Sequence, residues 1–233
     1  EKLKAKLAKA PAGSVHLLEN VRFEKGEETN EKKLAQAYAE LGDLFINNAF
    51  ASCHRAHVSV SGIAKILPAY AGPALVEEVA ALSRLLDKPK SPFIAVIGGL
   101  KLSTKLPLIQ ALCASCDKVL IGGAMATPFF KAQNMEVGRS AYEKEAVVLA
   151  KKLLKRKEIK LPTDVVVTQK ITDKSVLCYV SAKQLAKKDM IVDVGPHTLK
   201  AWAEIIGSAA TIVWNGPIGI AENAACGFGS RFL

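Results

Sequence analysis

The sequence predicts an α/β fold in which two α/β regions are joined by a helix. Five continuous apolar runs alternate with segments of helical periodicity in the second half of the chain. Continuous apolar strands that are each followed by a helix are typical of a parallel sheet covered on both faces. A long amphipathic segment precedes these runs, and a shorter series of strands and helices precedes that segment. With 233 residues and 50% apolar content, the chain has enough apolar surface to bury a core.

The first region, residues 1–73, consists of short expected elements that are ended by glycine or proline. In chain order we expect an exposed basic helix over 1–10, a strand over 15–19, a helix over 31–42, a strand over 43–50 and a helix over 59–67. Gly42 ends the second of these helices, and Pro68 ends the third. A helix over 74–89 follows, with apolar residues at i, i+3 and i+4 and a proline-rich link at its end. Its position favours a connector between two domains.

Residues 90–233 form the second region, in which strands and helices alternate regularly. The expected strands cover 93–97, 118–121, 164–168, 190–194 and 211–214, and the expected helices cover 105–115, 125–133, 141–157 and 197–206. In such a sheet, ligands bind beyond the carboxyl ends of the strands. Four of these ends carry glycines, namely Gly98–Gly99, Gly122–Gly123, Gly195, and Gly216 with Gly219. Because glycine lets the backbone approach a ligand closely, the pattern predicts a surface for a flat, phosphate-bearing molecule.

Two lysines follow the first of these glycine pairs. If Ser103 or Thr104 caps the next helix, Lys105 lies in its first turn. Lys101 then lies just before the helix, and Pro107 falls where its missing N–H costs nothing. Cations are disfavoured beside the positive end of a helix dipole, whereas a bound anion removes the conflict. A phosphate site and a solvated surface turn both stay open on this argument, since neither GxGxxG nor GxxxxGK[ST] is present.

The charge of the chain favours an anionic partner. Its formal value is +10, from 32 basic and 22 acidic residues. Aromatic residues make up only 6% of the chain and are not interleaved with basic runs, and the basic segment 151–160 has the spacing of a solvated helix face. We therefore do not expect nucleic-acid binding. No apolar stretch approaches the length of a membrane span, so no membrane partner is expected either.

The five cysteines are irregularly spaced, which favours a reducing compartment over a disulfide framework. Cys113 and Cys116 form a CxxC, but no second pair lies at zinc-finger spacing and both fall on one helix face. Cys53, His54 and His57 lack a fourth ligand nearby, which favours a structural or substrate-contact role. We expect no metal site made by side chains of this chain.

Taken together, the motifs resemble those of the phosphoglycerate kinase family. LLENVRFEKGEE resembles the family's LENVRF box, NNAFASCHRAH its DAFGTAHRAH box, and VIGGLKLSTK its GG[AS]KVS[DT]K box. Further along, IGGAMATPFFKAQ, LPTDVVV, DVGPHT and IVWNGPIGIAE match successive strand ends of the family in the same order. The resemblance covers essentially the whole chain.

The resemblance implies two Rossmann-like, three-layer domains with parallel sheets, joined by a hinge helix. It assigns glycerate binding to residues 1–73, the hinge to 74–89 and nucleotide binding to 90–233. The implied reaction is the reversible transfer of a phosphoryl group between 1,3-bisphosphoglycerate and ADP, which gives 3-phosphoglycerate and ATP in glycolysis. Mg²⁺ with ATP or ADP is the implied cofactor, and we expect a monomeric, cytoplasmic enzyme.

The family's functional positions fall on particular residues of this sequence. Arg22 and Arg55 match its positions for the anionic substrate, and guanidinium suits bidentate contact with carboxylate or phosphate. Lys101 and Lys105 match its phosphate-contacting lysines, and Lys101 is the expected catalytic residue. The other expected nucleotide contacts are Gly98, Gly123, Asn215, Pro217, Gly219 and Glu222.

Some residues depart from the family's pattern. Ala51 replaces a glycine, Leu100 a small residue beside the first lysine, and Ala221 an aromatic residue near the expected ribose carboxylate. The family's leading segment and its metal-binding GGGD[ST] loop are not found in the 233 residues. We therefore expect both domains to be incomplete and this chain by itself to be inactive. The alternative is a catalytically impaired structural or interaction subunit that keeps the fold.

Overall fold

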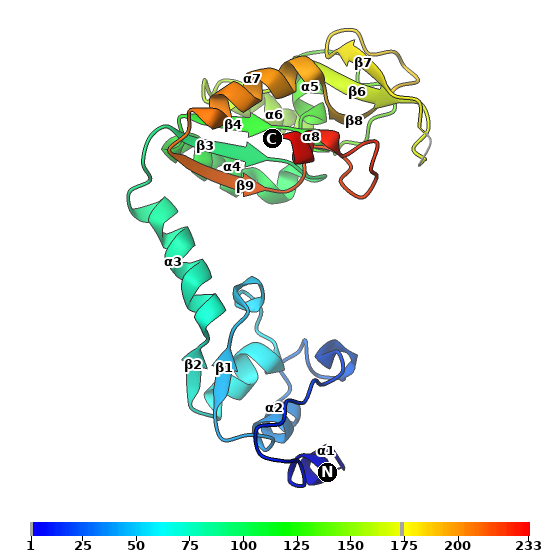
Figure 1. Ribbon diagram of the computed structural model, residues 1–233. Coiled ribbons are helices and arrows are strands. Elements are labelled where there is room, and N and C mark those ends of the chain that lie inside the picture. The colour runs from blue at the N-terminus through cyan, green and yellow to red at the C-terminus, as the bar shows by residue number, and fades with distance from the viewer. Residues whose placement is uncertain (1, 173–174) are drawn as a thin grey trace. The chain divides into compact units, whose positions relative to one another are not determined.

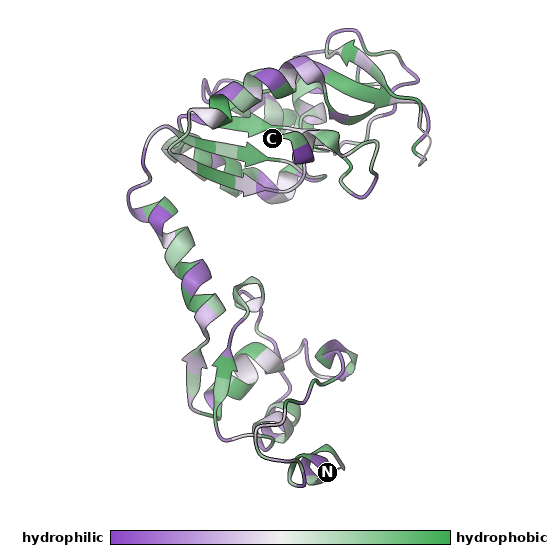
Figure 2. Ribbon diagram, in the orientation of Figure 1, coloured by the Kyte–Doolittle hydropathy of each residue, from purple (hydrophilic) through white to green (hydrophobic). Residues whose placement is uncertain are grey.

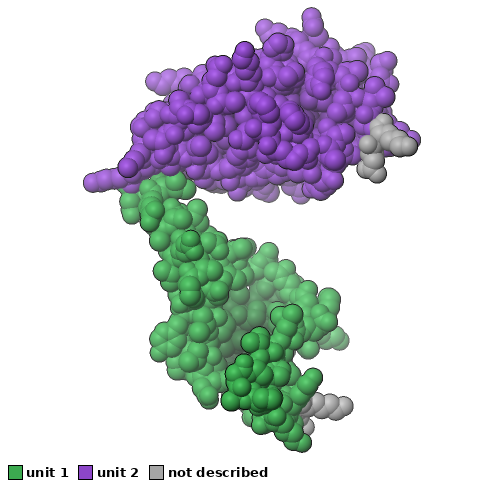
Figure 3. All heavy atoms as spheres, in the orientation of Figure 1, with its two compact units in different colours: residues 1–87 green, residues 88–233 purple. Residues whose placement is uncertain are grey.

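The computed structural model describes residues 2–172 and 175–233. The chain divides into two compact units, Glu1–Asp87 and Lys88–Leu233, each of which is described here by itself (Figure 3). Both units contain parallel strands and helices, so the predicted α/β fold class is confirmed. Among the residues that the structure describes, no helix is long and apolar enough to cross a bilayer.

The first unit is built around one pair of strands, and its elements are short except for the helix α3 (Pro73–Asp87) (Figure 1). In order they are α1 (Lys2–Leu7), η1 (Val21–Phe23), α2 (Lys32–Ala39), β1 (Phe45–Asn47), η2 (Phe50–Ser52), η3 (Val58–Gly62), η4 (Ile63–Lys65), β2 (Ala69–Ala71) and α3 (Pro73–Asp87). Strands β1 and β2 pair in parallel, with Phe45 opposite Ala69. The helices expected near the start of the chain, over 31–42 and after Gly72 are all present.

Two expectations for this unit are wrong. Residues 15–19 do not form a strand, and Val15 and Leu17 are 95% and 99% exposed. A strand needs a partner for its backbone hydrogen bonds, and this segment has none among the described residues. The helix expected over 59–67 is a turn of π-helix, η3, followed by a 3₁₀ turn, η4. Its β-branched residues and Gly62 disfavour a regular α-helix.

The second unit carries a four-stranded parallel sheet in the order β5-β4-β3-β9. The strands and helices are β3 (Phe93–Ile97), α4 (Leu102–Ser115), β4 (Lys118–Ile121), η5 (Gly123–Met125), α5 (Thr127–Ala132), α6 (Ala146–Leu153), β5 (Ile159–Lys160), β6 (Asp164–Thr168), β7 (Cys178–Ser181), β8 (Met190–Val194), α7 (Pro196–Gly207), β9 (Thr211–Asn215) and α8 (Phe228–Phe232). Every residue of β3 is buried. Figure 2 shows the apolar colour concentrated on the strands of this unit.

Successive side chains of each strand point to opposite faces of the parallel sheet, and both faces are packed. Ile94 and Val96 of β3 pack with Leu120 of β4 against Leu199 and Trp202 of α7. Helix α4 contacts β3 and β4, and it lies on the side away from α7 (Figure 1). Helices therefore cover both faces, as the continuous apolar runs predict.

The prediction that all five apolar runs share one parallel sheet is wrong. Strands β6 and β8, the runs over 164–168 and 190–194, lie in a separate antiparallel sheet with the order β7-β6-β8. All five residues of β6 are nevertheless buried. A continuous apolar run reports burial on both faces and does not report strand direction, so the sequence pattern is the same in both sheets.

We predict that Leu120→Ala destabilises the second unit by about 2–5 kcal/mol, because this fully buried side chain leaves a cavity between β4 and α7. Urea unfolding followed by circular dichroism measures the loss. Leu100→Ala is the matched control, since Leu100 is 74% exposed, and its stability should match that of the wild type. Equal stability of all three proteins would contradict this packing.

Candidate functional site

Three glycine-rich strand ends meet at one edge of the parallel sheet. Gly98–Gly99 follow β3, Gly122–Gly123 follow β4, and Gly216 follows β9. Gly98 N donates a 2.9 Å hydrogen bond to Asn215 O, which joins two of these ends. A Cβ on Gly98 would collide with the Pro217 carbonyl, so only glycine permits this close backbone approach.

The fourth expected end, Gly195, does not join this edge. It follows β8 in the antiparallel sheet and packs against the Asp164 carboxylate instead. That carboxylate accepts hydrogen bonds from His197 N and Thr198 N at 3.0 and 2.7 Å and caps the start of α7. Gly195 is therefore a structural contact between β6 and α7.

A mainly apolar pocket of about 360 Å³ opens beside the three strand ends. Its lining includes four of the residues expected to contact a nucleotide, which are Gly123, Pro217, Gly219 and Glu222. The other wall comes from residues that were not among the expected nucleotide contacts, and includes Thr127, Arg139, Ser140, Ala141, Ile171, Met190, Ile191 and Val192. Volume and lining suit the flat ring of a small ligand.

The second lysine of the LKLSTK segment points back toward the strand ends. Lys105 Nζ donates a 2.8 Å hydrogen bond to Gly98 O. The ammonium also lies beside Gly99 and Gly216, where added Cβ atoms would stand 3.1 and 2.9 Å from it. Burial lowers the pKa of Lys105. A partly desolvated cation thus stands beside the pocket, since Gly99 also lines the pocket.

The start of α4 differs from the expectation. The residue at the N-cap position is Lys101, which makes no side-chain cap, and Thr104 Oγ1 bonds to Lys101 O at 3.1 Å. Pro107 lies inside the helix, where its missing N–H removes one backbone hydrogen bond. The prediction that Ser103 or Thr104 is the N-cap is therefore wrong.

A carboxylate, Glu143, already occupies the start of this helix. Its oxygens accept hydrogen bonds from Ser103 N at 2.9 Å and from Ser103 Oγ at 2.7 Å. The backbone bond from Ser103 contributes most to lowering the pKa of Glu143, followed by the bond from the Ser103 hydroxyl. Lys101 lowers it further by charge. The unfavourable interaction between the lysines and the helix dipole is thus partly offset by a carboxylate of the protein itself, and Lys101 is exposed.

A buried carboxylate holds the loop that carries Pro217, Gly219 and Glu222. Asp193 of β8 is 1% exposed and accepts hydrogen bonds from Gly229 N at 2.7 Å and Val194 N at 2.8 Å. Gly219 packs directly on this carboxylate, where no Cβ would fit. Burial raises the pKa of Asp193. The loop is therefore fixed to β8, whose residues form the opposite wall of the pocket.

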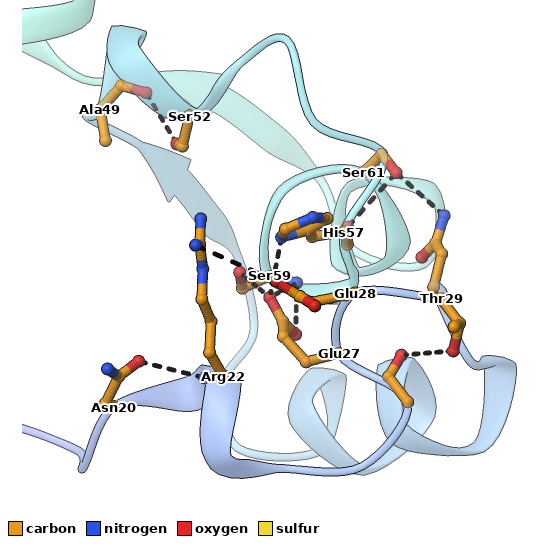
Figure 4. Close-up of polar contacts among 12 residues, drawn as sticks. Asn20, Arg22, Glu27, Glu28, Thr29, Ala49, Ser52, His57, Ser59 and Ser61 are labelled. Carbon is orange, nitrogen blue, oxygen red and sulfur yellow. Dashed lines mark hydrogen bonds and ion pairs between the residues drawn. The ribbon is translucent and has the colours of Figure 1, made fainter. Parts of the chain in front are cut away.

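The two expected substrate arginines lie in the first unit. Arg22 belongs to η1, and its Nη1 stands 4.0 Å from Glu28 Oε1 (Figure 4). Arg55 follows η2, is half-buried, and has its backbone N–H bonded to Ser52 O at 3.0 Å. Within the described part of the chain, no hydrogen bond or ion pair is recorded for the Arg55 side chain. Among the described residues, neither guanidinium is thus held by a close ion pair.

The cysteines show no sign of a metal or disulfide site. In residues 2–172 and 175–233, no three His, Cys, Asp or Glu side chains are grouped as metal ligands, and all five cysteines are free. Cys113, Cys116 and Cys226 are buried. Burial raises the pKa of Cys116 to about 12 and also raises that of Cys113. These thiols are core residues.

Comparison with known proteins shows that the family model described as phosphoglycerate kinase matches residues 1–233. The chain belongs to the phosphoglycerate kinase family. It is 47% identical over 215 residues to the phosphoglycerate kinase of Thermus thermophilus, with 90% of this chain and 55% of that protein covered.

Solved structures of the phosphoglycerate kinase family have the same fold as the chain. The Coxiella burnetii phosphoglycerate kinase is 40% identical with a TM-score of 0.77, covering 92% of this chain and 57% of that one. The Pyrococcus horikoshii enzyme is 27% identical with a TM-score of 0.86, covering 99% of this chain and 61% of that one. The chain thus spans little more than half the length of these relatives.

We predict that Glu143→Gln lowers stability at neutral pH but not in acid. Because the pKa of Glu143 is lowered by folding, its stabilisation is complete above the ordinary value of 4.5 and is lost as the pH falls through the lowered value. Thermal melts from pH 7 to pH 3 should show the two proteins converging below about pH 4.5. Glu145→Gln, an exposed neighbour, is the control. A pH-independent difference would refute this role.

We also predict that a thiol reagent modifies the native chain at Cys53 and Cys178 only. These two cysteines are exposed, whereas the other three are buried and their pKa values are raised. Mass spectrometry after brief alkylation at pH 8 locates the labels, and denaturation should expose all five sites. Fast labelling of Cys116 in the native chain would argue against this burial.

Proposed function

We propose that the protein carrying this chain is a phosphoglycerate kinase, which transfers a phosphoryl group reversibly between 1,3-bisphosphoglycerate and ADP in glycolysis. The observation that carries the proposal is the position of the Lys105 ammonium, which is bonded to Gly98 O and lies beside Gly99, a residue that lines an apolar pocket. A cation beside a pocket for a planar ring is the arrangement that a nucleotide with a phosphate tail requires. Membership of the family supports the same reaction.

On this proposal the second unit binds ATP or ADP. Phosphoryl transfer depends mostly on positioning and on neutralising charge, so it needs no nucleophilic side chain from the protein. Lys105 would neutralise phosphate charge at the strand ends, and the exposed Lys101 would approach the transferred group as the catalytic cation. Gly123 lines the pocket and would let the nucleotide approach the backbone, whereas Gly98 would hold the Lys105 ammonium through its carbonyl.

The loop after β9 would hold the nucleoside. Pro217 and Gly219 line the pocket, and Asn215 ends β9 next to them. Glu222 also lines the pocket and would accept hydrogen bonds from the ribose hydroxyls. Leu100, which departs from the family's pattern, lines the pocket and is 74% exposed.

The first unit would bind 3-phosphoglycerate or 1,3-bisphosphoglycerate through Arg22 and Arg55. Both guanidiniums are available for an anion, and both lie on short turns. We propose that α3 and its link, residues 74–89, form the hinge between a glycerate-binding domain (1–73) and a nucleotide-binding domain (90–233). A monomer in the reducing cytoplasm fits the free cysteines.

Mg²⁺ would accompany the nucleotide. The described residues offer no cluster of three metal-ligating side chains, so they do not by themselves form a site for this ion. Phosphate oxygens of ATP or ADP are hard oxygen ligands of the kind that Mg²⁺ prefers.

Lys105→Met tests the proposal. The variant keeps the aliphatic stem but removes the charge, so we predict at least about tenfold weaker ADP binding with little change in melting temperature. Isothermal titration of the full-length gene product with ADP gives the affinity, and coupled turnover of 3-phosphoglycerate with ATP gives the activity. Lys151→Met, an exposed lysine of α6, is the matched control.

The outcomes separate the two hypotheses for this chain. Loss of affinity and turnover in Lys105→Met but not in Lys151→Met supports the kinase. A wild-type protein that binds no ADP or ATP at millimolar concentration would favour the alternative, a structural subunit that keeps the fold. Unchanged turnover in Lys105→Met would remove the proposed role of this residue.

A further inference from the structure

Glu27 is a buried carboxylate in the first unit, and the proposed reaction gives it no role. Its side chain is 1% exposed and lies in the turn between η1 and α2. A buried carboxylate is strongly unfavourable unless it is hydrogen-bonded or paired with a cation. The partners of Glu27 therefore indicate what it does.

All recorded side-chain partners of Glu27 come from the segment 57–59 (Figure 4). Ser59 N points at both carboxylate oxygens, at 3.3 and 3.2 Å, and Ser59 Oγ donates to Oε1. His57 Nδ1 stands 4.0 Å from Oε1 and has a side chain that is 12% exposed. The backbone adds a bond from Val58 N to Glu27 O at 3.0 Å. We call these contacts the Glu27 clasp.

A second set of contacts supports the clasp. Asn30 Nδ2 donates to Ser61 Oγ at 3.0 Å, and Ser61 Oγ lies 3.3 Å from His57 O, to which it donates. Gly62 packs against Asn30 so closely that a Cβ would meet its amide oxygen at 2.5 Å. Two segments far apart in the chain are thus joined by polar contacts at several points.

The clasp joins the two turns that carry the substrate arginines. On one side, Glu27 N bonds to Glu24 O at 3.3 Å and Glu24 N bonds to Val21 O at 3.1 Å, which ties Glu27 to the turn of Arg22. On the other side, Arg55 precedes His57 by two residues and is tied to Ser52 O. Short hydrogen-bonded turns therefore connect both arginines to one buried carboxylate.

We propose that Glu27 is a positioning residue for the anionic substrate, because it fixes the turn of Arg22 relative to the turn of Arg55. Two guanidiniums bind one small anion well only if their spacing is set before the ligand arrives. The ligand class is a small phosphorylated carboxylate, and this inference rests on the proposed function. Glu27 acts through the two turns and does not itself touch substrate.

The test measures Michaelis constants in the full-length gene product. Glu27→Gln keeps the size of the side chain but removes its charge, which weakens the bonds from Ser59. We expect the KM for 3-phosphoglycerate to rise about tenfold, while the KM for ATP and kcat stay within about twofold. Glu24→Gln removes an equal, exposed charge beside the same turn, and should leave all three values unchanged.

A second variant and a second measurement distinguish a loss of positioning from misfolding of Glu27→Gln. Ser59→Ala removes only the hydroxyl bond, so its KM for 3-phosphoglycerate should rise about threefold. Amide hydrogen exchange should accelerate at 20–24 and 52–59 in both variants, and not throughout the protein. This regional change shows that the turns have loosened.

Three outcomes would count against the proposal. If wild type turns over 3-phosphoglycerate and both clasp variants keep its KM, the positioning role fails and the proposed function stands. If both KM values and kcat worsen together with the melting temperature, Glu27 serves stability alone and the positioning role fails as well. If wild type shows no turnover of 3-phosphoglycerate, the proposed function fails, and this inference fails with it.

Discussion

The parallel pairing of β3 with β4 and β9 determines where the candidate site of the second unit lies. It buries the whole of β3 and presents alternate residues to α7 and α4. Because the three strands run in one direction, their carboxyl ends meet at one edge. The backbone at Gly98 and Gly216 comes so close there that no side chain fits between the ends. The pocket, the Lys105 ammonium and the Pro217 loop all depend on this junction.

At this edge of the sheet, one negative charge comes from the protein itself, and we propose that a second comes from the ligand. Glu143 supplies the negative charge at the start of α4, where a helix dipole favours an anion. The Lys105 ammonium lies at the strand ends, where, among the residues that the structure describes, it bonds only to the Gly98 carbonyl oxygen. A cation that is partly desolvated and bonded to one neutral acceptor gains most from an arriving phosphate. On the opposite wall of the pocket, the Asp193 carboxylate accepts a hydrogen bond from Gly229 N and so holds the Pro217 loop on β8.

The first unit has less regular structure to order its turns, because its elements other than α3 are short and its sheet has two strands. Few apolar side chains are buried there, and Val15 and Leu17 are almost fully exposed. Polar contacts therefore carry much of the local order. The Glu27 clasp joins segments that the small sheet does not hold together, and it does so with charge-assisted bonds, which are directional. Directional contacts set the spacing of turns more narrowly than apolar packing does.

The sequence by itself determined the family, the α/β class, most helices and the central strands, because burial on both faces and glycine at strand ends leave a local pattern. It also predicted Gly123, Pro217 and Gly219 as parts of one site, and all three line the same pocket. The tertiary structure alone decided the rest. Strand direction in β6 and β8, the capping of α4 by Glu143 and the clasp at Glu27 each depend on partners distant in the chain. Such pairings leave no pattern in the local sequence. The same apolar run can form a parallel or an antiparallel strand, and the same carboxylate can face solvent or accept a hydrogen bond from a buried backbone N–H.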